Sequence, residues 1–211
     1  MDRTWIVLGE RVGLTALVRE EFIARWDRYN DPEIGMLMSY PVTSSAAVAP
    51  MKPPVTREHR EAVWELIVAR SIIGFEIRAA EDQRFVGECS LSRVTWPGGS
   101  AEIAVAILDR DDRGHGYGTE ATQLLAAYAF DGYGLHRVVL RYLAVNEAVV
   151  RACERSAAAV GGRVVGIERE AEWAFGARQD CVLMEILAAD FPPHPATEHL
   201  RATPSRVELP T

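Results

Sequence analysis

Hydrophobic and polar positions alternate along the chain with two periods, one typical of strands and one typical of helices. Apolar residues gather at 5–8 and 12–17 around a GERVG turn, which predicts an opening strand. Residues 20–29 follow with the apolar spacing of an amphipathic helix. Pro32 ends this helix, because proline disfavours helical backbone in the residue before it.

A proline-rich segment at 40–54 separates the first helix from the second. It predicts a long loop, and long loops inside a domain are often functional. Thr56 is typical of an N-cap, so we expect a second helix from there to about residue 70.

Three apolar runs rich in β-branched residues come next, at 72–79, 84–94 and 101–108. Short polar turns separate them, the second of which contains WPGGS. Successive strands joined by short turns pair antiparallel, so the sequence predicts a three-stranded meander.

Helices and strands alternate in the second half, with helices expected at 119–130 and 147–158 and strands at 136–143, 163–167 and 181–187. The fold class is therefore α/β (α+β). We expect one domain over 1–190, with a central mixed, mostly antiparallel sheet of about six or seven strands flanked by about four helices. Residues 191–211 contain five prolines and few large apolar side chains, which predicts a flexible tail.

Composition narrows the function. The 211 residues carry a net charge of −7, which argues against nonspecific nucleic-acid binding. No segment is apolar enough to span a membrane, and no secretory leader is evident, so we expect a cytoplasmic protein. Cys89, Cys153 and Cys181 lack a C-x-x-C spacing and indicate free thiols rather than a metal site. A homodimer is a default expectation.

The segment 109–120, DRDDRGHGYGTE, carries the strongest chemical signal. Three glycines at alternate positions lie between an apolar strand and an amphipathic helix. Glycine lets a ligand approach the backbone, and the first N–H groups of a helix attract anions. The segment therefore predicts a pyrophosphate site. A Rossmann site is disfavoured, since the G-x-G-x-x-G spacing is missing; a tight strand–helix connection remains the structural alternative.

This segment, RGHGYGTEA from Arg113, resembles the pyrophosphate loop of the GNAT acetyltransferase superfamily. Further ordered matches are similar to its ribosomal-protein alanine acetyltransferase branch, the RimJ/RimL type. They are NDPE from Asn30, FVGE from Phe85, AEI from Ala101, HRV from His136, NEA from Asn146 and DCVLM from Asp180.

The resemblance implies acetyl-CoA as cosubstrate and a primary amine, on a small molecule or a protein N-terminus, as acceptor. Main-chain groups of Ile107 and Leu108 would pair with the pantetheine arm, and Asn146 would help to fix the pantetheine or the acetyl end. The cofactor-binding loop would comprise Arg113, Gly114, His115, Gly116, Tyr117 and Gly118. The Arg113 side chain would contact phosphate, unless it is only a solvent-exposed charge.

Glu102 is the candidate general base. The strand period of two puts it on one face with Ala104 and Ala106, and these small neighbours leave room for an acceptor. The alternative is a surface carboxylate at the strand end. A backbone amide near Leu108 would meet the oxyanion.

The chain departs from the family where the branch carries a tyrosine that protonates the departing thiolate, because Cys153 stands there. A thiol is a weaker hydrogen-bond donor but could still serve, or Cys153 could simply pack on its helix. This departure leaves open a non-catalytic acyl-CoA-binding module. A nucleotide- or phosphate-binding structural protein is a third alternative.

Overall fold

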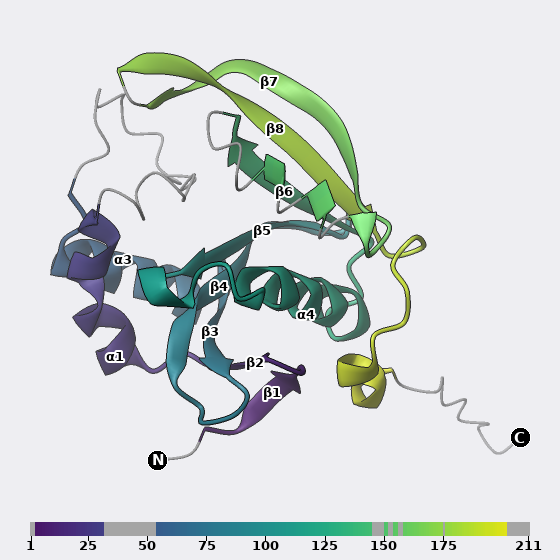
Figure 1. Ribbon diagram of the computed structural model, residues 1–211, viewed down its shortest axis with the longest axis horizontal. Helices are drawn as coiled ribbons and strands as arrows, with labels where there is room; N and C mark the ends of the chain where they lie inside the picture. Colours follow the sequence, from purple (N-terminus) through teal and green to yellow (C-terminus); the bar gives the residue numbers. More distant parts are fainter. Residues whose placement is uncertain are drawn as a thin grey trace, which may run out of the picture.

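The computed structural model describes residues 3–31, 54–144, 150–151, 154–155, 158–174 and 176–201. Eight strands form one sheet in the order β1-β2-β3-β4-β5-β6-β8-β7 (Figure 1). All neighbours pair antiparallel except β5 and β6, which are parallel. The strands are β1 Trp5–Leu8, β2 Val12–Ala16, β3 Ile73–Ala79, β4 Phe85–Thr95, β5 Ser100–Ile107, β6 Arg137–Leu143, β7 Arg163–Ala174 and β8 Ala177–Leu187.

The helices lie on both faces of this sheet. The α-helices are α1 Arg19–Ala24, α3 Arg57–Val68 and α4 Tyr117–Asp131, and the 3-10 helices are η1 Trp26–Asn30, η2 Arg110–Asp112 and η3 Pro195–Leu200. Within the described ranges, no helix has the length and apolar character needed to cross a membrane.

The predicted class and the meander β3–β4–β5 are confirmed. The sheet has eight strands rather than about six or seven, because the opening segment forms a hairpin of two strands, β1 and β2. The helix expected at 20–29 breaks at Arg25 into α1 and η1. The second helix begins as predicted, since the Thr56 hydroxyl accepts from the His59 N–H at 3.2 Å.

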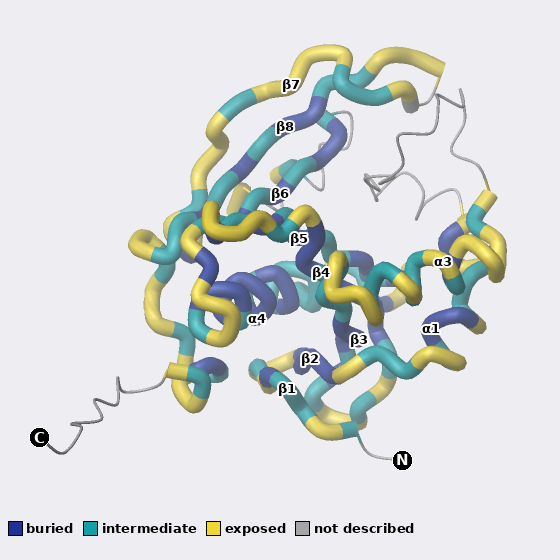
Figure 2. Tube along the Cα trace, turned by 180° about the vertical axis from the view of Figure 1, so that it is seen from behind, coloured by how far each residue is buried: buried dark blue, intermediate teal, exposed yellow. Residues whose placement is uncertain are grey.

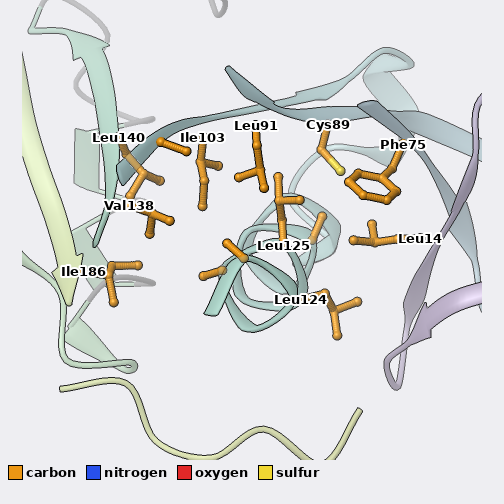
Figure 3. Packing of buried hydrophobic residues seen from close by; sticks show 14 of the residues in the cluster. Leu14, Phe75, Cys89, Leu91, Ile103, Leu124, Leu125, Val138, Leu140 and Ile186 are labelled. Carbon is orange, nitrogen blue, oxygen red and sulfur yellow. The ribbon is translucent and has the colours of Figure 1, made fainter. Parts of the chain in front are cut away.

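The main core lies between the sheet and α4. Leu124 and Leu125 of α4 are fully buried in one cluster with Leu91 and Ile103 of the central strands, and Leu125 points towards Leu91 (Figure 3). Figure 2 shows the same pattern, with burial concentrated on α4 and the central strands and β7 largely exposed. A side chain with an odd number on β5, such as Ile103, therefore faces α4.

The opposite face of the sheet carries α1 and α3, which are joined to it by buried ion pairs. Arg60 of α3 donates to Glu88 of β4 at 2.7 Å, and the Tyr29 hydroxyl donates to the same carboxylate at 2.6 Å. Arg25 donates to the fully buried Glu76 at 2.9 Å. Even-numbered side chains of β5 lie on this face, because Glu88 is directly opposite Ala106 in the antiparallel register.

The start of the expected flexible tail is packed onto α4 instead. The rings of Phe191 and Phe130 lie 5.2 Å apart, and the buried Thr197 hydroxyl donates to Asp131 at 2.6 Å. His194 caps η3 by accepting the Ala196 N–H at 3.2 Å. Aromatic burial and a satisfied cap hold residues 191–201, which the proline content alone did not reveal.

Candidate active site

A gap opens in the sheet between β5 and β6. The two strands pair in parallel only at Ser100↔Arg137, Ala101↔Val138 and Glu102↔Val139. β5 continues for five more residues to Ile107, and β6 continues to Leu143 in full register with β8. Beyond Glu102 the facing edge of β5 therefore has no strand partner within the described chain.

The N–H and C=O groups of successive strand residues point to opposite edges, and this alternation decides which groups of β5 face the gap. The Gly99 carbonyl, just before β5, accepts N–H groups from His136 at 2.6 Å and Arg137 at 3.1 Å, which joins the start of β5 to β6. At the other end the Leu108 N–H donates to Val86 at 3.2 Å, so even-numbered groups point towards β4. Ile103, Val105 and Ile107 thus present N–H and C=O groups to the gap, as a strand edge would to an extended ligand.

The backbone groups of Ile107 and Leu108, both of which the sequence suggested for pairing with the pantetheine, point in opposite directions. Ile107 faces the gap, in line with a role in pairing. The N–H of Leu108 is already bonded to β4 and cannot meet an oxyanion in this structure. The amide of Ile107, next to Leu108 in the chain, faces the gap instead.

The gap leads to the glycine loop at the start of α4. Gly114 and Gly116 have φ angles of +82° and +84°, in the left-handed region that glycine adopts without strain. Gly116 is the N-cap of α4, and Gly118 in the first turn lies against Ile107, since a Cβ there would be 3.5 Å from the Ile107 side chain. The end of β5 and the N-terminus of a 15-residue helix therefore meet at one point.

The other loop residues have distinct places. Arg113 turns back onto β5, and its guanidinium donates to the carbonyls of Ile107 at 3.3 Å and Leu108 at 3.4 Å. A contact with phosphate would require this side chain to leave them. His115 and Tyr117 lie near each other, with ring centroids 6.0 Å apart. Their side chains are partly or fully exposed, so these residues offer the site mainly backbone groups.

Glu102 lies at the point where β5 and β6 part, on the face opposite α4. Its side chain is 11% exposed, and an Arg93 nitrogen lies 3.4 Å from its carboxylate. Arg93 reaches it from a bulge in β4, where the register shifts between Ser92 and Thr95. Ser92 is directly opposite Glu102, and its buried hydroxyl has no hydrogen-bond partner in the described structure.

The described cysteines do not fit a nucleophile. Burial raises the pKa of the Cys89 thiol far above its ordinary value. Burial, opposed by Arg141, raises that of Cys181 to about 11. Both side chains are buried, so neither supplies a thiolate near neutral pH. Among the described residues, no cluster of three or more His, Cys, Asp or Glu could hold a metal ion.

A strand edge that leads to a helix N-terminus suits an extended thioester carrying a pyrophosphate, and the comparison of sequences agrees. The model of the acetyltransferase (GNAT) domain matches residues 11–158, more than two thirds of the chain. The chain belongs to the GNAT acetyltransferase family. It is an acetyl-CoA-dependent N-acetyltransferase.

Solved structures share the fold of this GNAT protein. Spermidine N-acetyltransferase from Vibrio cholerae, in complex with CoA and spermine, is 19% identical, covers 86% of this chain and 98% of its own, and superposes with a TM-score of 0.72. Ribosomal-protein-S5-alanine acetyltransferase from Vibrio fischeri is 18% identical, covers 88% and 98%, and has a TM-score of 0.65. At these identities the likeness concerns the fold alone. No curated protein matches the chain by sequence.

Two residues singled out from the sequence of this GNAT protein, Asn146 and Cys153, lie outside the described residues, as does most of the helix expected at 147–158. Sequence reasoning in turn missed Arg93, Ser92 and Arg11, which the tertiary structure brings to the site. None of them belongs to a recognisable motif, and each is near the site only through strand pairing or a turn contact.

Proposed function

We propose that this GNAT protein transfers the acetyl group of acetyl-CoA to a primary amine by direct attack, with Glu102 as general base. The observation that carries the proposal is the parting of β5 and β6 at Glu102, whose open edge runs to the glycine loop. The thioester would then lie near Glu102, and the phosphates would bind at the glycine loop at the other end of the gap.

The coenzyme would lie along this edge. Its pantetheine arm would pair with the backbone of Val105 and Ile107, as an added strand does. Its pyrophosphate would bind the amides of residues 113–118 at the N-terminus of α4. The positive φ of Gly114 and Gly116 supports this placement, because such backbone turns successive N–H groups outward without strain.

Chemistry would occur on the face opposite α4. The incoming amine gives its proton to Glu102 and forms a bond to the acetyl carbon, and the carbon–sulfur bond then breaks. The buried Ser92 hydroxyl opposite Glu102 supports an acceptor or water site there, since an unpaired buried hydroxyl is costly. Protonation of the thiolate by Cys153 and a role for Asn146 in fixing the pantetheine are parts of the same proposal.

For the acceptor we propose a protein N-terminus or a small amine. The names of structural neighbours support both classes, since one acts on spermidine and another on a ribosomal-protein alanine. Of these two acceptor classes, the ordered sequence matches to the RimJ/RimL branch favour a protein N-terminus. A cytoplasmic homodimer completes the proposal.

An assay of thiol release tests the function directly. The purified protein is given acetyl-CoA with spermidine, spermine or a peptide beginning with alanine, and free CoA is measured. Release that depends on one acceptor supports the transferase and identifies its substrate class. Stabilisation by acetyl-CoA without release under any acceptor would instead indicate the non-catalytic acyl-CoA-binding module. No stabilisation by millimolar acetyl-CoA would reject both.

A further inference from the structure

An arginine from the other end of the sequence lies against the glycine loop. Arg11 belongs to the turn between β1 and β2, and a Cβ added to Gly116 would lie only 2.7 Å from its Nη1 atom. The guanidinium therefore occupies the space beside the N-cap of α4 that a side chain at residue 116 would fill. The positive φ of Gly116 favours glycine here, and the lack of a side chain leaves this space to Arg11.

The backbone of this turn is fixed to α4 by Glu120. One oxygen of the Glu120 carboxylate accepts the main-chain N–H of Glu10 at 2.5 Å. Both oxygens lie 3.1 Å from the main-chain nitrogen of Arg11 and accept its N–H. The contact spans more than a hundred residues of sequence and ties Arg11 to the first turn of the helix. The Glu120 carboxylate thereby accepts two main-chain N–H groups of the turn.

Other arginines near the loop are already bonded. Arg28 pairs with Asp109 at 2.9 Å, and Arg84 pairs with Asp112 at 2.7 Å, which raises the pKa of Arg84. Arg113 donates to the carbonyls at the end of β5. Arg11 is exposed, and no carboxylate among the described residues pairs with its guanidinium. The Arg11 guanidinium lies beside an anion-binding loop and has N–H donors that no described carboxylate engages. Such a group is suited to bind phosphate.

We propose that Arg11 is a phosphate-binding residue for coenzyme A, reaching from the β1–β2 turn to the phosphates held at the N-terminus of α4, with Glu120 as the residue that positions it. The inference rests on the proposed function of the same loop. It adds a side-chain contact from a part of the chain that precedes the motif by about a hundred residues, where motif reasoning does not look.

Calorimetric titration of the parent protein and of Arg11→Gln tests the contact, with three acetyl donors that carry different phosphate groups. These are acetyl-CoA, acetyl-CoA lacking the 3′-phosphate, and S-acetylpantetheine, which lacks both the diphosphate and the adenosine. We expect Arg11→Gln to weaken acetyl-CoA binding about tenfold, as for loss of a charge-assisted hydrogen bond, and to leave S-acetylpantetheine unaffected. Arg11→Lys should fall between parent and Arg11→Gln. The matched control is Arg57→Gln, an exposed arginine on α3, which should bind all three donors as the parent does.

Each outcome bears on the proposal. Weakening with both phosphorylated donors identifies the diphosphate as the contact, and weakening with acetyl-CoA alone identifies the 3′-phosphate. Parental affinity of Arg11→Gln for acetyl-CoA would overturn the inference alone. Equal weakening with S-acetylpantetheine would also overturn it, because Arg11 would then only shape the loop. A parent protein that binds no acetyl-CoA would overturn the proposed function and this inference with it.

Discussion

The guanidinium of Arg93 lies 3.4 Å from the carboxylate of Glu102, at the point where β5 and β6 part. Arg93 is half exposed, with 51% of its side chain accessible, whereas Glu102 is nearly buried. This pair allows a structural role for Glu102 to be separated from a chemical one, because either partner can be removed in turn.

Glu102→Gln should lower turnover by about 10²–10⁴-fold and leave acetyl-CoA affinity unchanged, because the amide keeps the size of the side chain but cannot take a proton. Steady-state kinetics across pH and a separate titration with acetyl-CoA measure the two effects.

Arg93→Gln is the matched control for this change. It removes the same ion pair, which is half exposed and contributes at most about 1 kcal/mol to stability. If Glu102 served only to hold Arg93, the two variants would have similar rates. A parental rate for Glu102→Gln would remove the carboxylate from the mechanism and leave proximity as the source of catalysis.

Gly116→Val should abolish the rise in melting temperature that acetyl-CoA produces, because residue 116 has a φ of +84° and its Cβ would meet Arg11. In the parent, acetyl-CoA at a hundred times its Kd should raise the free energy of unfolding by about 2.7 kcal/mol. Gly134→Val supplies the control, since Gly134 also has a positive φ but has open space around it at the far end of α4. A shift retained by Gly116→Val, or lost equally in both variants, would argue against the loop as the site.

Glu88→Gln should destabilise the fold by about 3–5 kcal/mol, since it removes the charge of the buried carboxylate that pairs with the Arg60 guanidinium. Urea unfolding measures the loss. Glu61→Gln breaks the exposed Arg57–Glu61 pair on the same helix and should cost less than about 1 kcal/mol. An equal loss of unfolding free energy in both variants would mean that the buried Arg60–Glu88 pair stabilises the fold no more than an exposed pair does.

We expect the protein to lose stability in mild acid because of His194. Burial lowers its pKa below the ordinary value of 6.5, so the unfolded chain takes up this proton before the folded one does. Its contribution is complete above about pH 6.5 and falls as the pH drops through the lowered folded pKa. His194→Asn keeps a cap acceptor for η3 but cannot titrate. Unfolding free energies at pH 7.5 and 5 should differ less in this variant than in the parent; the same difference in both would exclude His194.

The sequence by itself determined the class of fold, the meander, α4 and the loop before it. These depend on local patterns: the periods of apolar residues, the Thr56 cap, and glycines where a helix begins. It also indicated Glu102 correctly as a residue on the small-residue face of β5, because strand alternation is a local property. The resemblance to the GNAT family followed from ordered matches to the same local elements.

Only the tertiary structure decided which backbone groups are open and which side chains meet. Leu108 and Ile107 are adjacent in sequence, yet β4 takes the N–H of one and leaves the other facing the gap. Arg93 reaches Glu102 through a bulge, and Arg11 reaches Gly116 through a turn held by Glu120. Residues 191–201 became part of the domain by packing on α4. Such contacts join residues that are distant in the chain, and their free energy comes from burial and pairing in the assembled fold, which no local pattern records.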